Sequence, residues 1–282
     1  MGHSLNSLEF SLIVGLFGAA AGFLGALTGL GGGVVITPVL TLLFGVDIRY
    51  AIGATLVSVI ATSSGAASAF LKEGFSNIRI GMFLEIATTF GAITGAFLAT
   101  RIATSALGVI LGLVLLYSAF LSTRPKSELH TGARSDPLAD RLMLDSTYPT
   151  PHGWQPYRVQ RVKTGFGMMF GAGALSGMLG IGSGALKVLA MDHAMRIPFK
   201  VSTSTSNFMI GVTAAASAGV YLNRGYIDPV LAMPVMLGVS IGSLLGARHL
   251  SGADTRVLRI IFGLVVGVLA VEMIYNGLSG KI

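Results

Sequence analysis

Long stretches of uncharged, apolar residues are the feature that most constrains the fold of this chain. A helix needs about 20 residues to cross the hydrocarbon core of a bilayer. Five uncharged runs reach that length: Ser11 to Leu30, Tyr50 to Leu71, Ile102 to Leu121, Thr164 to Leu186 and Val201 to Leu222. Ile80 to Thr100, Pro229 to Ala247 and Val257 to Tyr275 are further candidates. Because lipid cannot satisfy the backbone and these runs lack strand alternation, we predict an all-α integral membrane protein.

The composition supports lipid rather than water as the main solvent. Hydrophobic residues make up 52% of the chain and charged residues 11%, with a mean hydropathy of +0.77. The absence of cysteine excludes disulfides and thiolate metal sites, and we expect no cofactor and no metal. The net charge of +7 lies largely in one central hydrophilic segment. A cytoplasmic location explains this charge better than a nucleic-acid partner does.

The chain is a duplication. A shift of 151 residues aligns Gly22 to Leu116 with Gly173 to Gly267 without a gap, and 19 of these 95 positions are identical, eight of them glycine. Each half is predicted to contain a long apolar segment, a glycine motif, a short apolar segment and three longer helices. The short segments are Val34 to Val46 and Ala185 to Ile197.

The distribution of basic residues favours two inverted repeats of about five membrane segments each. If every segment crosses and the N-terminus is outside, 14 Lys and Arg residues lie inside and four outside. If the first two segments of each half make one crossing, the count is 11 against seven. We predict a first membrane repeat at 1–121, a linker at 122–163 and a second membrane repeat at 164–282. By the positive-inside rule, the protein is integral to the cell (inner) membrane, with the linker in the cytoplasm and both termini on the outer side. The linker is expected to be a loop with little core of its own.

The glycine motifs Gly29 to Gly33 and Gly180 to Gly184 are candidate breaks in membrane helices. Such breaks can direct unpaired N–H groups toward an anion near the middle of the membrane. We therefore expect Gly31, Gly32, Gly33, Gly182, Ser183 and Gly184 near a substrate. Tight helix packing is the alternative explanation for these glycines. A nucleotide loop is excluded because no βαβ unit follows.

Polar residues near the second motif provide the chemistry for binding an anion. Lys187 follows Gly184 within one turn, and a lysine at membrane depth is a functional candidate unless it snorkels or pairs with a carbonyl. Thr203, Ser206 and Asn207 share one helix face and, with Ser204, could donate hydrogen bonds to an anion. Helix capping and bonds to nearby carbonyls are equally good explanations for this run.

The first half carries a weaker polar pattern. Thr55, Ser58 and Thr62 form a stripe in which Thr55 is the substrate-binding candidate, although helix packing explains the stripe as well. Glu85, Asp192 and His193 are candidates for proton coupling, against a purely structural role for each. No paired carboxylates, nucleophile elbow or metal-binding histidine pair is present, so the chain is not expected to be an enzyme.

Three ordered motifs on this duplicated register resemble the sulfite exporter TauE/SafE family of membrane permeases. They are Gly29 to Pro38, Gly180 to Val188, and Val201 to Ala216 followed by Tyr221 to Pro229. The resemblance covers nearly the whole chain and implies transport, in several members export, of small sulfur-containing or carboxylate anions such as sulfite or sulfoacetate. Ser183 stands where glycine is common in the family, and Leu189 stands where proline is common.

We therefore predict a secondary transporter with one central anion site, which is opened alternately to each side. Its partners are a small anionic substrate and the lipid bilayer, and it is expected to be a monomer or a weak homo-oligomer. A passive anion channel and a membrane scaffold or sensor acting through the linker are the alternatives.

Overall fold

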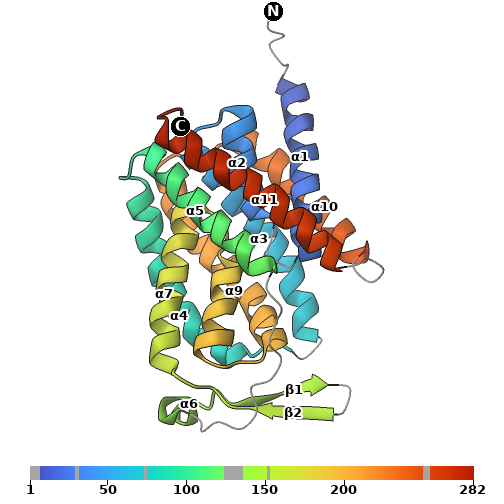
Figure 1. Cartoon of the computed structure of the whole chain (residues 1–282), viewed down its shortest axis with the longest axis vertical. Helices are drawn as coiled ribbons and strands as arrows, with labels where there is room; N and C mark the ends of the chain where they lie inside the picture. Colours follow the sequence, from blue (N-terminus) through green and yellow to red (C-terminus); the bar gives the residue numbers. More distant parts are fainter. Residues whose placement is uncertain (1–6, 29–31, 73–74, 124–135, 151–152, 250–254) are drawn as a thin grey trace, which may run out of the picture.

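The computed structural model of the chain describes residues 7–28, 32–72, 75–123, 136–150, 153–249 and 255–282. Within them the fold is a bundle of helices with one small β-hairpin (Figure 1). The first-half helices are α1 (Ser7–Thr28), α2 (Gly33–Phe44), α3 (Ile48–Lys72), α4 (Ile78–Ala99) and α5 (Thr104–Thr123). The linker contains α6 (Pro137–Arg141), β1 (Ser146–Thr150) and β2 (Gly153–Tyr157). The second-half helices are α7 (Val162–Leu179), α8 (Gly184–Leu189), the π-helix η1 (Ala190–Ala194), α9 (Phe199–Asn223), α10 (Pro229–His249) and α11 (Thr255–Leu278).

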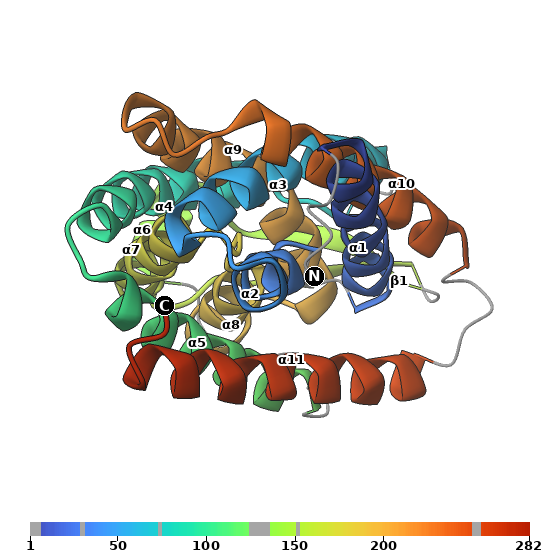
Figure 2. The ribbon, with the colours of Figure 1, turned by 90° about the horizontal axis from the view of Figure 1, so that it is seen from above.

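The duplicated sequence gives duplicated elements. Helices α2, α3, α4 and α5 each begin 151 residues before α8, α9, α10 and α11. The packing also repeats. Helix α1 packs on α10, and in the equivalent contact α7 packs on α4. Likewise α3 packs on α10, and α9 packs on α4. Helices α3 and α9 pack on each other, and so do α5 and α11, which lie together along one edge of the bundle in Figure 2. Each repeat therefore completes its core with elements of the other.

Small residues allow these helix pairs to approach closely. A Cβ atom at Gly91 or Gly95 of α4 would overlap the backbone carbonyl of Phe170 or Ala174 on α7. At Gly242 of α10, a Cβ atom would overlap the carbonyl of Ala19 on α1. These contacts provide the close packing on which helix association in lipid depends.

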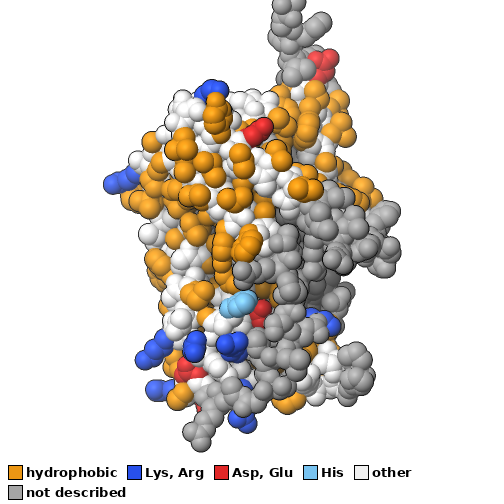
Figure 3. All heavy atoms as spheres, in the orientation of Figure 1, with side chains coloured by type: hydrophobic (Ala, Val, Ile, Leu, Met, Phe, Trp, Pro, Cys, Tyr) orange, Lys and Arg blue, Asp and Glu red, His pale blue; other side chains and the backbone are white. Residues whose placement is uncertain are grey.

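The outer surface of the bundle is apolar. Large side chains such as Leu16, Phe90, Leu113 and Leu244 are 55–70% exposed. Figure 3 shows hydrophobic side chains over the middle of one face, with Lys and Arg gathered mainly around the linker end. Among the described residues, Ile78–Ala99 and Pro229–Gly246 are long and apolar enough to cross a membrane. Shorter apolar helices accompany them in both halves.

The linker lies at one end of the bundle, opposite the start of α1 and the C-terminus (Figure 1). The expectation of a loop is met only in part, because residues 146–150 and 153–157 pair as two antiparallel strands. Leu144, Tyr157 and Val159 join a hydrophobic cluster with Ile80 and Leu84 of α4. The linker therefore has no separate core but is packed onto the base of the bundle.

Asn77, at the start of α4, connects this helix to the linker. Its Oδ1 accepts the N–H of Ile80 and caps α4, while its Nδ2 donates to the Leu144 carbonyl at 3.1 Å and to the Tyr157 hydroxyl at 2.7 Å. Burial raises the pKa of Tyr157 to about 12, so the phenol stays protonated at neutral pH.

We expect Asn77→Ala to loosen the linker. Loss of the cap costs about 1 kcal/mol, and loss of the two donated hydrogen bonds adds about 0.5–1.5 kcal/mol each. Limited proteolysis should therefore cut the linker of the variant faster than that of wild type. Asn223→Ala, at an exposed position of α9, is the control. Equal cleavage of the two variants would contradict this role of Asn77.

Candidate functional site

The second glycine motif is a sharp break between two helices. Gly180 ends α7 in the left-handed region (φ 70°), Gly182 has φ 69° and Ser183 has φ 41°, after which α8 begins at Gly184. Left-handed conformations favour glycine, so Ser183 occupies a position that a glycine would accept more easily. Its hydroxyl donates to the Ala172 carbonyl at 2.8 Å, which holds the break against α7.

The first motif ends at Gly32 and Gly33, where α2 begins. Gly31, which was predicted to lie near the substrate, is outside the described residues. The two motifs meet inside the bundle: a Cβ atom at Gly33 would lie 3.4 Å from the Gly180 carbonyl. The side chain of Val59 contacts both Gly33 and Gly182, and Ile210 lies against Gly182 and Gly184. The repeat therefore brings its two breaks together, with apolar side chains packed against them.

Lys187 is the most unusual residue at this junction, because its side chain is completely buried. Its Nζ donates to Oγ1 of Thr213 on α9 at 2.5 Å, and the same Oγ1 donates to Oε1 of Glu85 on α4 at 2.7 Å. Thr89 donates to this carboxylate oxygen as well, at 3.2 Å. An ammonium group can only donate, so the Thr213 hydroxyl must be the acceptor. Its single hydrogen is then directed to Glu85 or to the Met209 carbonyl, 3.0 Å away.

This arrangement links two buried charges across the repeats. Glu85 comes from the first half, whereas Thr213 and Lys187 come from the second. Glu85 is 8% exposed, and its second oxygen, Oε2, has no hydrogen-bond partner among the described residues. An isolated charge is costly in an apolar interior, so each of these groups depends on the other. Lys187 thus neither snorkels to the surface nor pairs with a carbonyl.

The polar residues at the start of α9 have several different partners. Ser206 donates to the Gly184 carbonyl at 3.3 Å and therefore lies at the break. Ser204 shares a 2.7 Å hydrogen bond with Ser76, in the connection before α4. Thr203 Oγ1 is buried and without a partner among the described residues, and Asn207 is half-buried. Ser206 is thus the residue of this run that contacts a described glycine of the two motifs.

The corresponding face of α3 lies at the first motif. A Cβ atom at Gly33 would be 3.1 Å from Cγ2 of Thr55, which is the repeat equivalent of Ser206. The Thr55 hydroxyl accepts a 2.9 Å hydrogen bond from Thr37 and donates to the Ala51 carbonyl at 2.8 Å. Ser58 and Thr62 donate to carbonyls of the preceding turn. The stripe in the first half is thus occupied by internal hydrogen bonds.

Asp192 and His193 lie on η1, further along the segment that begins with α8. Asp192 is buried, while the His193 side chain is 69% exposed and its Nε2 is 4.0 Å from Oδ2 of Asp192. Two residues after His193, the Met195 carbonyl accepts a hydrogen bond from the N–H of Gln160 in the linker. This end of the segment therefore lies beside the linker. Leu189 does not lead into a regular α-helix, since the segment widens into the π-helix directly after it.

Sequence reasoning missed Thr213. It lies on the same face of α9 as Thr203 and Ser206. The positions 203, 206, 210 and 213 follow one another at spacings of three, four and three residues, as the residues on one helix face do. It is also identical to its repeat equivalent, Thr62, in an alignment with few identical polar positions. Both signals were present in the sequence. Its two charged partners, however, are far away in the chain, and only the fold brings them together.

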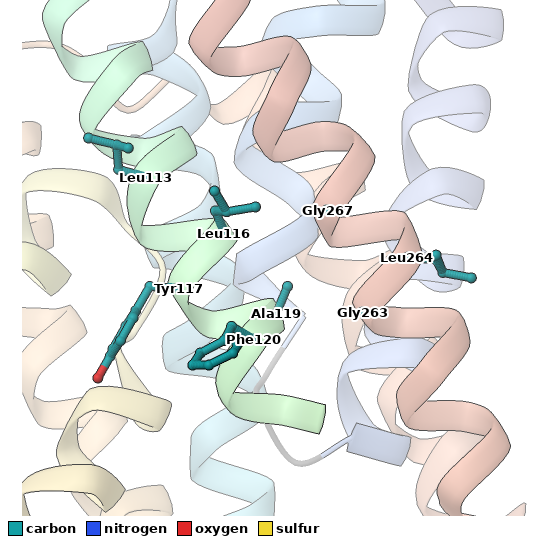
Figure 4. A pocket seen from close by; sticks show the side chains of 8 residues that line it. All are labelled: Leu113, Leu116, Tyr117, Ala119, Phe120, Gly263, Leu264 and Gly267. Atoms are coloured by element: carbon teal, nitrogen blue, oxygen red, sulfur yellow. The ribbon is translucent and has the colours of Figure 1, made fainter. Parts of the chain in front are cut away.

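An open apolar groove of about 670 Å³ lies elsewhere, between α5 and α11 (Figure 4). It is lined by leucine, phenylalanine, tyrosine, alanine and glycine residues. Because the described residues of this lining include no cationic group, we do not place the anion site there. Lys187 and the glycine breaks remain the candidate site.

The chain is similar to known membrane transporters over nearly its whole length. The chain is 27% identical to the probable membrane transporter protein YunE of Bacillus subtilis over 96% of its own length and 99% of that protein. It is 26% identical to the probable membrane transporter protein MJ0441 of Methanocaldococcus jannaschii, over 94% and 97% of the two chains. No solved structure matches the chain. The sequence profile of the sulfite exporter TauE/SafE family matches residues 14–273. The chain belongs to this family of membrane transporters, and it is not an enzyme.

Proposed function

We propose that this protein is a secondary transporter that exports small sulfur oxyanions or organosulfur anions, such as sulfite or sulfoacetate. The observation that carries the proposal is the completely buried ammonium of Lys187 beside the junction of two helix breaks. A buried cation beside a helix break can attract an anion, as in transporters whose half-helix N-termini face the substrate. The family to which the chain belongs supports the choice of sulfur oxyanions.

In this proposal the two breaks form one binding site. The N–H groups at Gly31 to Gly33 and Gly182 to Gly184 bind the oxygen atoms of the anion, and Lys187 supplies the positive charge. The hydroxyls of Thr55, Ser206 and the nearby residues of α9 orient it. Val59 and Ile210 pack against the breaks and must move apart to admit the anion.

The packing of α4 and α9 supports inverted repeats. Three hydrogen bonds join these helices and the connection before α4: Ser76 to Ser204, Asn77 to Thr205 and Glu85 to Thr213. The sequence separation is 128 residues in each, so α4 and α9 run in the same direction. Helix α10, the repeat equivalent of α4, follows α9 after only five residues and returns along the bundle. This order of helices supports opposite directions for equivalent helices, the arrangement that alternating access between inverted repeats uses.

This arrangement also supports the proposed topology. The linker lies at the opposite end of the bundle from the start of α1 and the C-terminus (Figure 1). Lys and Arg side chains gather around the linker end (Figure 3). By the positive-inside rule, this end faces the cytoplasm of a cell whose inner membrane holds the protein. Both termini then face outward.

Flux in proteoliposomes tests the proposed function. Purified protein is reconstituted, and the movement of sulfite, sulfoacetate, thiosulfate and small carboxylates is measured against protein-free liposomes. We expect saturable flux of at least one sulfur-containing anion, accelerated by unlabelled anion on the opposite side. A membrane potential of 100 mV supplies about 2.3 kcal/mol per charge to drive the anion outward.

The same measurements separate the alternatives. Flux that rises linearly with concentration, without acceleration by exchange, would identify a passive channel. No flux of any anion in the panel would remove the transport proposal and leave a scaffold or sensor acting through the linker.

A further inference from the structure

We propose that Glu85 is the resident counter-ion of Lys187 and that the transported anion binds together with a proton that neutralises Glu85. The inference rests on the proposed anion site, and it assigns the coupling ion and the sign of the coupling. It also makes Thr213 a positioning residue, since its hydroxyl holds the two charged groups in one hydrogen-bonded chain.

The charge balance of the buried site leads to this coupling. With Lys187 positive and Glu85 negative, the site is neutral before any anion arrives. A monoanion entering beside Lys187 would leave one uncompensated negative charge in an apolar interior, which is costly. One proton on Glu85 restores neutrality. The anion and the proton therefore favour each other's binding, and both move in the same direction through the transporter.

The surroundings of Glu85 offer no equally placed substitute for Lys187. Helices α7 and α9 pack on α4, and their described charged or titratable side chains are Lys163, Lys200 and Tyr221. Lys163 and Lys200 are exposed near the starts of their helices, and Tyr221 lies near the far end of α9, where its hydroxyl donates to the Met178 carbonyl. The segment of α8 and η1 contributes Lys187 itself and then Asp192 and His193 beside the linker. Arg79, on α4 itself, is exposed and donates to the Met143 carbonyl of the linker.

The carboxylate of Glu85 is suited to accept the proton. Its Oε1 accepts hydrogen bonds from the hydroxyls of Thr213 and Thr89. Its Oε2 is buried and has no hydrogen-bond partner among the described residues. Oε2 can therefore take the proton without breaking a bond to either threonine. Once Glu85 is neutral, Lys187 is free to donate to the anion.

Proton uptake on anion binding is the direct test. Sulfite binding to the full-length protein is measured by isothermal titration calorimetry in buffers of different ionisation enthalpy, at several pH values. Methanesulfonate, whose single negative charge does not change in this pH range, is titrated in parallel. Any proton taken up when it binds therefore comes to the protein and not to the ligand. We expect wild type to take up close to one additional proton per anion at alkaline pH, and its affinity to fall up to about tenfold per pH unit there.

Glu85→Gln should bind sulfite without the additional proton and with little of this pH dependence. At alkaline pH it should bind at least about tenfold more tightly than wild type, because no carboxylate competes for Lys187. A residue with only a structural role would weaken binding when replaced. Glu85→Asp should keep the proton uptake, and Glu272→Gln, at an exposed position of α11, should behave as wild type.

Each outcome decides the matter. Wild type that binds sulfite without additional proton uptake overturns the coupling while leaving the anion site in place. The same is true if uptake persists in Glu85→Gln. If that variant is unstable when purified alone, sulfite should raise its unfolding temperature more than that of wild type, and failure to do so also counts against the proposal. If wild type binds no anion of the panel, the proposed function itself fails and the coupling falls with it.

Discussion

Lys187→Met is expected to abolish anion flux and to lower the free energy of unfolding by about 3–5 kcal/mol, the cost of breaking a buried ion pair. The variant keeps the length of the side chain but leaves the Glu85 carboxylate buried with only hydroxyl donors. The double variant Lys187→Met/Glu85→Gln removes both charges. It should recover most of the lost stability, because a neutral buried pair is often as stable as the ionic one.

Transport should not recover with stability. We expect flux through the double variant to stay at the level of protein-free liposomes, because the cation that attracts the anion is still missing. Thermal unfolding of the purified proteins and flux in proteoliposomes measure the two effects separately. Lys200→Met, at an exposed position of α9, is the control and should retain both properties. Wild-type flux through Lys187→Met would exclude this residue as the countercharge.

Gly177→Leu should prevent the halves from packing. A Cβ atom at Gly177 of α7 would overlap the backbone carbonyl of Ala92 on α4, and a backbone atom cannot rotate away as a side chain can. Overpacking by a single methyl group costs about 1–3 kcal/mol. We therefore expect a leucine, which is much larger, to leave little folded protein.

The same helix supplies the matched control. Gly171 is exposed, and a Cβ atom there meets no other atom within 4 Å, so Gly171→Leu should fold as wild type does. The yield of monodisperse protein in size-exclusion chromatography, followed by thermal unfolding, compares the two variants. Similar yields would mean that the contact between α4 and α7 does not limit stability.

The polar run of α9 shows where sequence patterns stop being informative. Helical spacing places Thr203, Ser206 and Asn207 on one face, but spacing alone does not identify what that face meets. In the structure Ser206 donates to the Gly184 carbonyl, while Thr205 accepts the Asn77 N–H at 3.1 Å from the other repeat. These partners lie 22 and 128 residues away, so they depend on how whole helices dock.

The linker illustrates the same limit in a different way. Its prolines and charges predicted a loop, because no apolar run marks a separate core. The end of the hairpin is anchored because Tyr157 joins the hydrophobic cluster that contains Ile80 and Leu84 of α4. The surface that stabilises this hairpin is supplied by another part of the chain, and local composition does not record it.

The sequence by itself determined that the chain folds in a lipid bilayer and that it is duplicated. It also determined the positions of the helix breaks and the presence of Lys187 after one of them. Hydrophobic length, repeat register and glycine content are local properties, so they can be read without a structure. Only the tertiary structure decided that the two breaks meet and that Thr213 joins Lys187 to Glu85. Hydrogen bonds and charge pairs act over a few ångströms in space, and helices from both halves must pack before such distances arise.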